Sequence, residues 1–222
     1  MSNQQATPPA GPVIGQRTGF EVASPSEPGA ASIESALARN RAFAAAGGHK
    51  GTVVFPNLRL FVITCLDPRV DPAHFLGLEL SDAIAVRNVG GRVTPEVIND
   101  VAFIGQIAEN VLPDGPLFEV AVIQHTQCGT AALADDTFRH RYAQRIDAEE
   151  STLRGRAILD PAATVTSDVQ RHRSAPAISP RITVSGHVYD VVTGLVETIL
   201  SAGRPGDQSV EHPKPPQGGQ TP

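Results

Sequence analysis

The stretch LRLFVITCLDPRVD, residues 58–71, decides how the rest of the chain is interpreted. Its first seven residues are mostly apolar or β-branched, which is typical of a strand buried on both faces of a sheet. Cys65 follows at once, and Asp67 and Arg69 then stand at alternate positions. The sequence therefore predicts a core strand that delivers a thiol, a carboxylate and a guanidinium to one edge of a sheet.

Three other segments have the composition of strands. AIAV at 83–86 is short and runs into a turn with two glycines, whereas FEVAVIQ at 118–124 is as apolar as the first strand. The stretch at 182–199 predicts a C-terminal hairpin with its turn near Gly194. The chain thus supplies three buried strands and a closing pair.

Helical patterns separate these strands. One of them has Thr94 as N-cap and Pro95 as its first residue, and it ends before Pro113. Others are expected at 32–46, capped by Ser32 and ended by Gly47, at 129–144, and at 160–176, capped near Thr166. Alternating strands and helices predict an α/β fold with a mainly parallel central sheet flanked by helices, and the hairpin adds an antiparallel C-terminal strand.

Composition divides the 222 residues into one folded part and two ends. Residues 1–31 and 203–222 are rich in Pro, Gly and polar residues, so both are expected to be disordered. Residues 32–202 form the expected domain. Hydrophobic residues make up 41% of the chain, with no Trp, so its core should consist mainly of Val, Ile, Leu and Ala.

Charge and cysteine content exclude several classes of protein. The net charge of −5 gives no electrostatic reason to expect nucleic acid or an anionic membrane as partner. No apolar run is long enough for a transmembrane helix, and the N-terminus lacks the features of a secretory signal. Two cysteines are too few for a disulfide scaffold, so a reducing, cytoplasmic location is expected.

The two cysteines and one histidine predict a metal site. Cys65 follows the first buried strand, and His125 and Cys128, in the segment QHTQCG, follow the third. Thiolate and imidazole ligands in a tetrahedral set are typical of zinc, and three protein ligands leave a fourth position open for catalysis. Three alternatives remain: small buried cysteines, a disulfide, and an unmetallated thiolate nucleophile paired with His125.

Asp67 and Arg69 fit beside such a metal. Alternate residues of an extended segment point the same way, so the guanidinium can hold the carboxylate and keep it ionised. Asp67 would then orient a water molecule on the metal, or would itself take the fourth ligand position in a closed, inactive state. The alternative is an ordinary ion pair of a surface loop.

With CLDPRV and HTQCG in hand, the chain resembles the β-class carbonic anhydrases. That family carries Cys-x-Asp-x-Arg and, later, His-x-x-Cys-Gly. The segment LGLELSDAIAVRNVGG between them is similar to a third family motif, and HVYDVVTGLVE resembles the strand pair that closes many members. The resemblance covers roughly residues 32–201.

The resemblance implies a zinc enzyme that converts carbon dioxide and water reversibly to bicarbonate and a proton. Cys65, His125 and Cys128 would bind Zn²⁺, and Asp67 with Arg69 would form the catalytic dyad that orients hydroxide on the metal. It also implies a homodimer or a larger homo-oligomer, in which the helix at 32–46 packs on the partner subunit.

The glycine turn and the dyad loop carry further expectations. The backbone amides near Gly90 and Gly91 are expected to lie beside the substrate, with a simple tight turn as the alternative. Pro68 stands where the family more often has Ser or Ala, which stiffens the loop and removes one amide donor.

The same motifs are compatible with two other functions. Members resembling this family hydrolyse carbonyl sulfide or carbon disulfide on the same ligand set. A non-catalytic zinc-binding protein of this fold is the third possibility.

Overall fold

The computed structural model describes residues 33–207 as two units, one ending at Gly48 and the other beginning at His49. The first unit contains α1 (Glu34–Ala45), with Ile33 as N-cap. The predicted cap, Ser32, and the segments 1–31 and 208–222 lie outside the described residues. The helix ends as predicted, because Gly47 adopts the positive φ of 75° that suits a glycine just past a C-cap.

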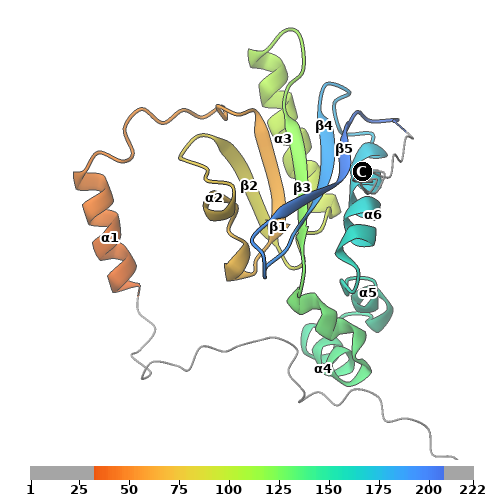
Figure 1. Cartoon of the computed structure of the whole chain (residues 1–222). Helices are drawn as coiled ribbons and strands as arrows, with labels where there is room; N and C mark the ends of the chain where they lie inside the picture. Colours follow the sequence, from red (N-terminus) through yellow and green to blue (C-terminus); the bar gives the residue numbers. More distant parts are fainter. Residues whose placement is uncertain (1–32, 208–222) are drawn as a thin grey trace, which may run out of the picture. The chain divides into compact units, whose positions relative to one another are not determined.

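The second unit is built on one five-stranded sheet in the order β2-β1-β3-β4-β5 (Figure 1). Its strands are β1 (Leu60–Cys65), β2 (Ala83–Asn88), β3 (Glu119–His125), β4 (Thr183–Tyr189) and β5 (Val196–Gly203). The first four pair in parallel, and β5 pairs antiparallel to β4. The predicted fold class is therefore confirmed, including the antiparallel C-terminal strand.

Helices cover both faces of this sheet. On one face, α3 (Pro95–Val111) and α6 (Pro161–Arg173) contribute Val97, Val101, Val165 and Val169 to the main core. On the other face, Phe75 of the short helix α2 (Pro72–Phe75) packs among apolar strand residues. The interior strand β1 is buried from its second residue onward, as expected for a strand covered on both sides.

Two helix predictions need correction. The helix expected at 129–144 is split into the 3-10 helix η2 (Gly129–Ala134) and α4 (Asp136–Ile146), because Asp135 accepts a hydrogen bond from the Phe138 amide and starts a new helix. The last helix, predicted at 160–176, is capped by Asp160 rather than near Thr166, since the Asp160 carboxylate accepts from the Ala163 amide at 3.0 Å. In contrast, α3 is capped by Thr94, begins at Pro95 and ends at Val111, as predicted.

The remaining elements are the 3-10 helix η1 (Pro68–Val70), which follows β1, and α5 (Glu150–Arg154), which follows α4. Within residues 33–207, no helix has both the length and the apolar character that a membrane span requires.

His172 on α6 makes the stability of this fold depend on pH. Its ring is fully buried, and neither ring nitrogen has a hydrogen-bond partner among the described residues. Burial, assisted by the charge of Arg173, lowers the pKa of His172 from 6.5 to about 4. Between these values the unfolded chain binds a proton that the folded chain does not, so stability falls as the pH falls.

We expect the free energy of unfolding to lose about 3 kcal/mol through this group between pH 6.5 and 4, at roughly 1.4 kcal/mol per pKa unit. His172→Leu should remove that part of the acid sensitivity, because leucine fills similar space without a titrating group. Urea unfolding of both proteins at pH 7.5 and pH 4.5 checks this. Equal losses of stability in the two proteins would show that His172 does not contribute.

Candidate metal centre

The sheet brings Cys65 and His125 to the same edge. Cys65 is the last residue of β1 and His125 the last residue of β3, and these two strands are parallel neighbours in register from Leu60↔Glu119 to Thr64↔Ile123. Cys128 lies three residues further on, at the N-cap of η2. Gln127, at a left-handed φ of 56°, turns the chain so that Cys128 comes back towards Cys65.

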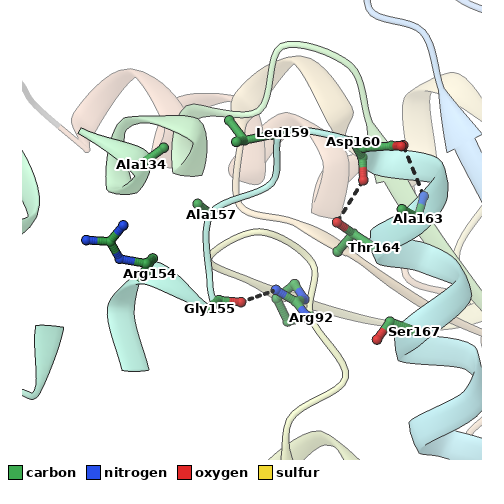
Figure 2. A pocket seen from close by; sticks show the side chains of 10 residues that line it. All are labelled: Arg92, Ala134, Arg154, Gly155, Ala157, Leu159, Asp160, Ala163, Thr164 and Ser167. Atoms are coloured by element: carbon green, nitrogen blue, oxygen red, sulfur yellow. Dashed lines mark hydrogen bonds between the residues drawn. The ribbon is translucent and has the colours of Figure 1, made fainter. Parts of the chain in front are cut away.

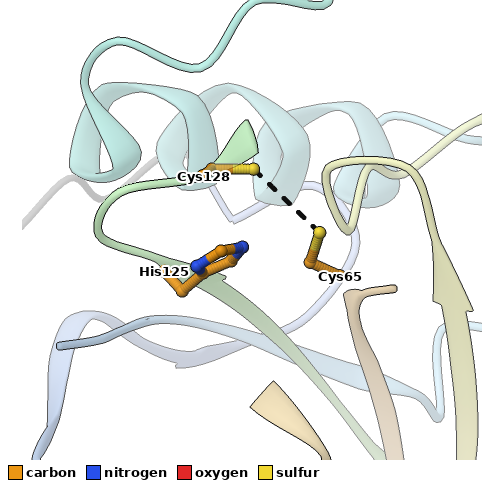
Figure 3. Close-up of side chains that lie close together, drawn as sticks. All are labelled: Cys65, His125 and Cys128. Carbon is orange, nitrogen blue, oxygen red and sulfur yellow. Dashed lines mark hydrogen bonds between the residues drawn. The ribbon is translucent and has the colours of Figure 1, made fainter. Parts of the chain in front are cut away.

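The three side chains lie close together, with their ligand atoms all within 4.8 Å of one another (Figure 3). The sulfur atoms of Cys65 and Cys128 are 4.0 Å apart. Two thiolates bound to one zinc ion at about 2.3 Å and at a tetrahedral angle would lie about 3.8 Å apart. The two cysteines are free thiols, so the alternative of a disulfide is not what the structure shows.

His125 is oriented as a metal ligand would be. Its Nδ1 lies 2.9 Å from the Thr126 carbonyl oxygen, to which it can donate a hydrogen bond. A carbonyl partner on one ring nitrogen fixes the tautomer and leaves the other nitrogen with its lone pair. That other atom, Nε2, is buried and has no partner among the described residues. An orphaned acceptor beside two thiols matches the donor set of a zinc site.

The two thiols differ in acidity because they share one hydrogen bond. The bond from Cys65, together with the Thr130 hydroxyl 3.2 Å away, lowers the pKa of Cys128 to about 6. The same thiol pair, followed by burial, raises the pKa of Cys65 to about 12. The shared hydrogen bond thus favours ionisation of Cys128, and a bound cation would favour ionisation of both thiols.

Asp67 and Arg69 form a close pair, although the backbone between them differs from the expectation. The segment is not extended: Pro68 begins η1, and the Asp67 carboxylate caps it by accepting from the Arg69 amide at 2.9 Å. The Arg69 Nε and Nη2 atoms donate to the two carboxylate oxygens at 3.0 and 2.7 Å. These bonds hold the pKa of Asp67 below its usual value.

Asp67 is not a member of the three-residue cluster in this structure. Both of its carboxylate oxygens face Arg69, and Arg69 also donates to the Gln127 carbonyl at 3.2 Å, which ties the pair to the loop before Cys128. The backbone amide of Asp67 partly opposes the rise in the pKa of Cys65, so the start of this loop also reaches the first thiol.

Arg87 of β2 is a site residue that the sequence analysis missed. Its guanidinium donates to three consecutive carbonyl oxygens, those of Cys65, Leu66 and Asp67, at 3.0, 3.2 and 2.8 Å. It also pairs with Asp71 at 3.0 Å. Arg87 thereby fixes the backbone that carries both the first thiol and the Asp67 carboxylate. Its position in the motif RNVGG was the only available signal.

The glycine turn after β2 lies against the candidate metal centre. A Cβ atom on Gly91 would come within 2.8 Å of the Cys65 amide nitrogen and of the Thr64 carbonyl carbon, so the turn approaches the β1 backbone as closely as glycine allows. Gly90 instead faces the side chains of Ile158 and Thr130. That the backbone amides of Gly90 and Gly91 lie beside the substrate stays a prediction.

Apolar side chains surround the thiols. Val70 and Ile158 are buried with Cys65 and Cys128 in one cluster. Three partly buried residues pack against it: Phe75, Tyr189 and Val191. The Phe75 and Tyr189 rings stack with their centroids 4.5 Å apart. The candidate metal centre therefore has an apolar wall, to which Tyr189 of β4 contributes.

The geometry described above agrees with comparisons to known proteins. A sequence model of the family described as carbonic anhydrase matches residues 60–196. β-Carbonic anhydrase 1 of Mycobacterium tuberculosis (strain H37Rv) is 28% identical over 155 residues, which cover 69% of this chain and 90% of that protein. The carbon disulfide hydrolase of Acidianus sp. (strain A1-3) is 26% identical over 160 residues, which cover 62% of this chain and 75% of that protein.

A solved structure supports the same relationship. The carbonic anhydrase of Streptococcus mutans superposes with a TM-score of 0.63 at 30% identity, and the match covers 75% of this chain and 97% of that chain. The family match spans more than half of the sequence and includes the cysteine, histidine and dyad motifs. This chain belongs to the β-carbonic anhydrase family.

Proposed function

We propose that this protein hydrates carbon dioxide reversibly to bicarbonate and a proton, with Zn²⁺ held by Cys65, His125 and Cys128. The observation that carries the proposal is the buried, unpartnered Nε2 atom of His125 beside two thiols 4.0 Å apart. Bound zinc supplies a Lewis acid that makes water acidic enough to ionise near neutral pH.

The protein side chains then have separate tasks. Asp67, ionised because Arg69 donates to both of its oxygens, accepts a hydrogen bond from the attacking water and orients it. Arg69 holds that carboxylate in one position. The apolar wall that includes Val70 and Phe75 suits a small substrate without charge. In this structure Asp67 is hydrogen-bonded to Arg69. The proposal includes a second, closed state in which Asp67 is the fourth metal ligand.

His125→Gln tests the metal assignment. We expect zinc to fall from about one ion per chain to a small fraction of that, because three-ligand sites lose most of their affinity without one ligand. His140→Gln is the matched control: His140 is an exposed histidine of α4 that contacts Glu150, so its replacement should leave zinc unchanged. Elemental analysis of the purified, folded proteins measures both. Full zinc in His125→Gln would refute the assignment.

Carbon disulfide hydrolysis is the second candidate, because three carbon disulfide hydrolases are among the relatives. We prefer carbon dioxide as the substrate because the match covers 90% of the mycobacterial carbonic anhydrase but 75% of the Acidianus hydrolase. Stopped-flow hydration of carbon dioxide beside turnover of carbonyl sulfide and carbon disulfide distinguishes them. Turnover of only the sulfur compounds would favour the second candidate, and no turnover with zinc bound would favour a non-catalytic protein.

We also propose a homo-oligomer located in the cytoplasm. Support for the assembly comes from α1, in which no residue is buried and Leu37 is 40% exposed. A helix of twelve residues is marginal on its own in water, and packing on a partner subunit would stabilise it. The buried free thiols suit a reducing compartment.

A further inference from the structure

A cavity lies between η2, the end of α5 and the first turns of α6 (Figure 2). Its volume is about 470 Å³, which is in the range of small-molecule sites. None of the three candidate zinc ligands lines it. Ala157 and Leu159 line it, whereas Ile158 between them is buried against the two cysteines. One short segment therefore separates two distinct sites.

Arg92 is a charged residue of the cavity lining, and some of its N–H groups have hydrogen-bond partners within the protein. Its Nε and Nη2 atoms donate to the two oxygens of Asp168 at 2.7 and 3.1 Å, and Nη1 donates to the Gly155 carbonyl at 3.3 Å. A guanidinium has five N–H groups, so one on Nη1 and one on Nη2 have no partner among the described residues. Each free N–H group of a guanidinium can donate a charge-assisted hydrogen bond to a carboxylate oxygen.

A net positive charge remains at the Arg92 side of the cavity, because Arg92 shares its carboxylate partner with a second arginine. Asp168 is fully buried, and it binds Arg171 at 2.7 Å in addition to Arg92. Two guanidinium groups thus share one carboxylate. The Gln124 side chain and the Val93 amide, at 3.4 and 3.3 Å, also donate to that carboxylate and hold it in place. Arg92 is consequently rigid, 13% exposed and not neutralised by its partner alone.

The rest of the lining is suited to an anion with a short apolar part. Arg154 adds a second guanidinium, 64% exposed and paired with Asp136. Ala134, Ala157 and Leu159 add apolar surface. Figure 2 shows Thr164 and Ser167 along the α6 side of the cavity.

The acidic member of the lining is Asp160. Its carboxylate is occupied by the Ala163 amide, and its carbonyl oxygen accepts from the Thr164 hydroxyl at 2.8 Å. It therefore opposes an anion less than a free carboxylate would.

We propose that this cavity binds a small organic carboxylate, with the carboxylate on the free N–H groups of Arg92 and the apolar part against Ala157 and Leu159. Arg154, whose guanidinium is paired with Asp136, adds a second positive charge on the exposed side of the cavity. The site is separate from the proposed zinc chemistry and does not depend on it. No step of the proposed hydration reaction uses these residues.

Calorimetric titration of the full, zinc-loaded chain with benzoate tests the proposal, and benzamide is the uncharged control of the same shape. Benzoate should bind saturably at one site per chain, and benzamide should not. Arg154→Ala should weaken benzoate binding about threefold, because it removes one of the two positive charges of the lining and that charge is exposed. Arg156→Ala removes an exposed arginine that does not line the cavity, so it should have no effect.

Ala163→Leu provides a second, independent variant, because it fills the cavity with a good helix former and changes no charge. It should abolish benzoate binding while zinc content stays at the level of the unchanged chain. The proposal is overturned if benzoate does not bind, or if it binds equally well to Arg154→Ala and Ala163→Leu. It is also overturned if binding is lost in His125→Gln but kept in those two variants, since the anion would then occupy the metal centre.

Discussion

Asp67→Asn is expected to lower kcat/KM for carbon dioxide hydration about 100-fold or more, the usual range for loss of a positioned proton acceptor. The substitution keeps the shape of the side chain but removes its charge. The new amide presents donors where the carboxylate offered acceptors only, so the attacking water loses its fixed orientation. Arg69 in turn loses the carboxylate that it now binds through Nε and Nη2. Stopped-flow measurement at neutral pH gives the rate.

The zinc content should be unchanged by this substitution, because Asp67 is not one of the three clustered candidate ligands. Zinc content therefore separates loss of catalysis from loss of the site. Asp100→Asn, which removes an exposed carboxylate from α3, is the control and should leave the rate unchanged. A normal rate in Asp67→Asn with full zinc would remove Asp67 from the mechanism. Low zinc in that variant would instead make Asp67 a metal ligand.

The positions of the thiols and the imidazole were predictable because they depend on short-range signals. Apolar β-branched runs end at Cys65 and His125, and parallel strands place such ends at one edge of a sheet. The turn of η1 was not predicted, because alternation was interpreted as extended chain although Pro68 favours a helical start after a capping aspartate. The pair still formed, since the cap itself brings Arg69 to the carboxylate.

The residues that support the site were not predictable from the sequence alone, because their partners are far away in the chain. Arg87 binds carbonyl oxygens about twenty positions earlier, and Asp168 binds an arginine 76 positions earlier. Asp168 belongs to no local pattern that distinguishes it from a surface charge, and Arg87 was marked only by its place in the motif RNVGG. Only the folded arrangement shows that Asp168 is fully buried and that Arg92 connects it to the turn after β2.

Gly91→Ala is expected to destabilise the protein by about 3 kcal/mol or more and to lower its zinc content. Gly91 has a φ of 59°, which alanine adopts only with strain. The added Cβ would also lie 2.8 Å from backbone atoms of Thr64 and Cys65, and an interior strand paired on both sides cannot move aside as a side chain can. The displacement would act directly on the residue that carries the first thiol.

Gly90→Ala is the matched control for that substitution. Its φ of 80° imposes similar backbone strain, but the added Cβ would meet the ends of the Ile158 and Thr130 side chains at 3.1 and 3.3 Å. Those side chains can shift, so we expect a loss of about 1–2 kcal/mol and full zinc. Urea unfolding and elemental analysis of both variants measure the difference. Equal effects of the two substitutions would mean that strain in the turn, and not contact with the β1 backbone, is what makes glycine necessary beside Cys65.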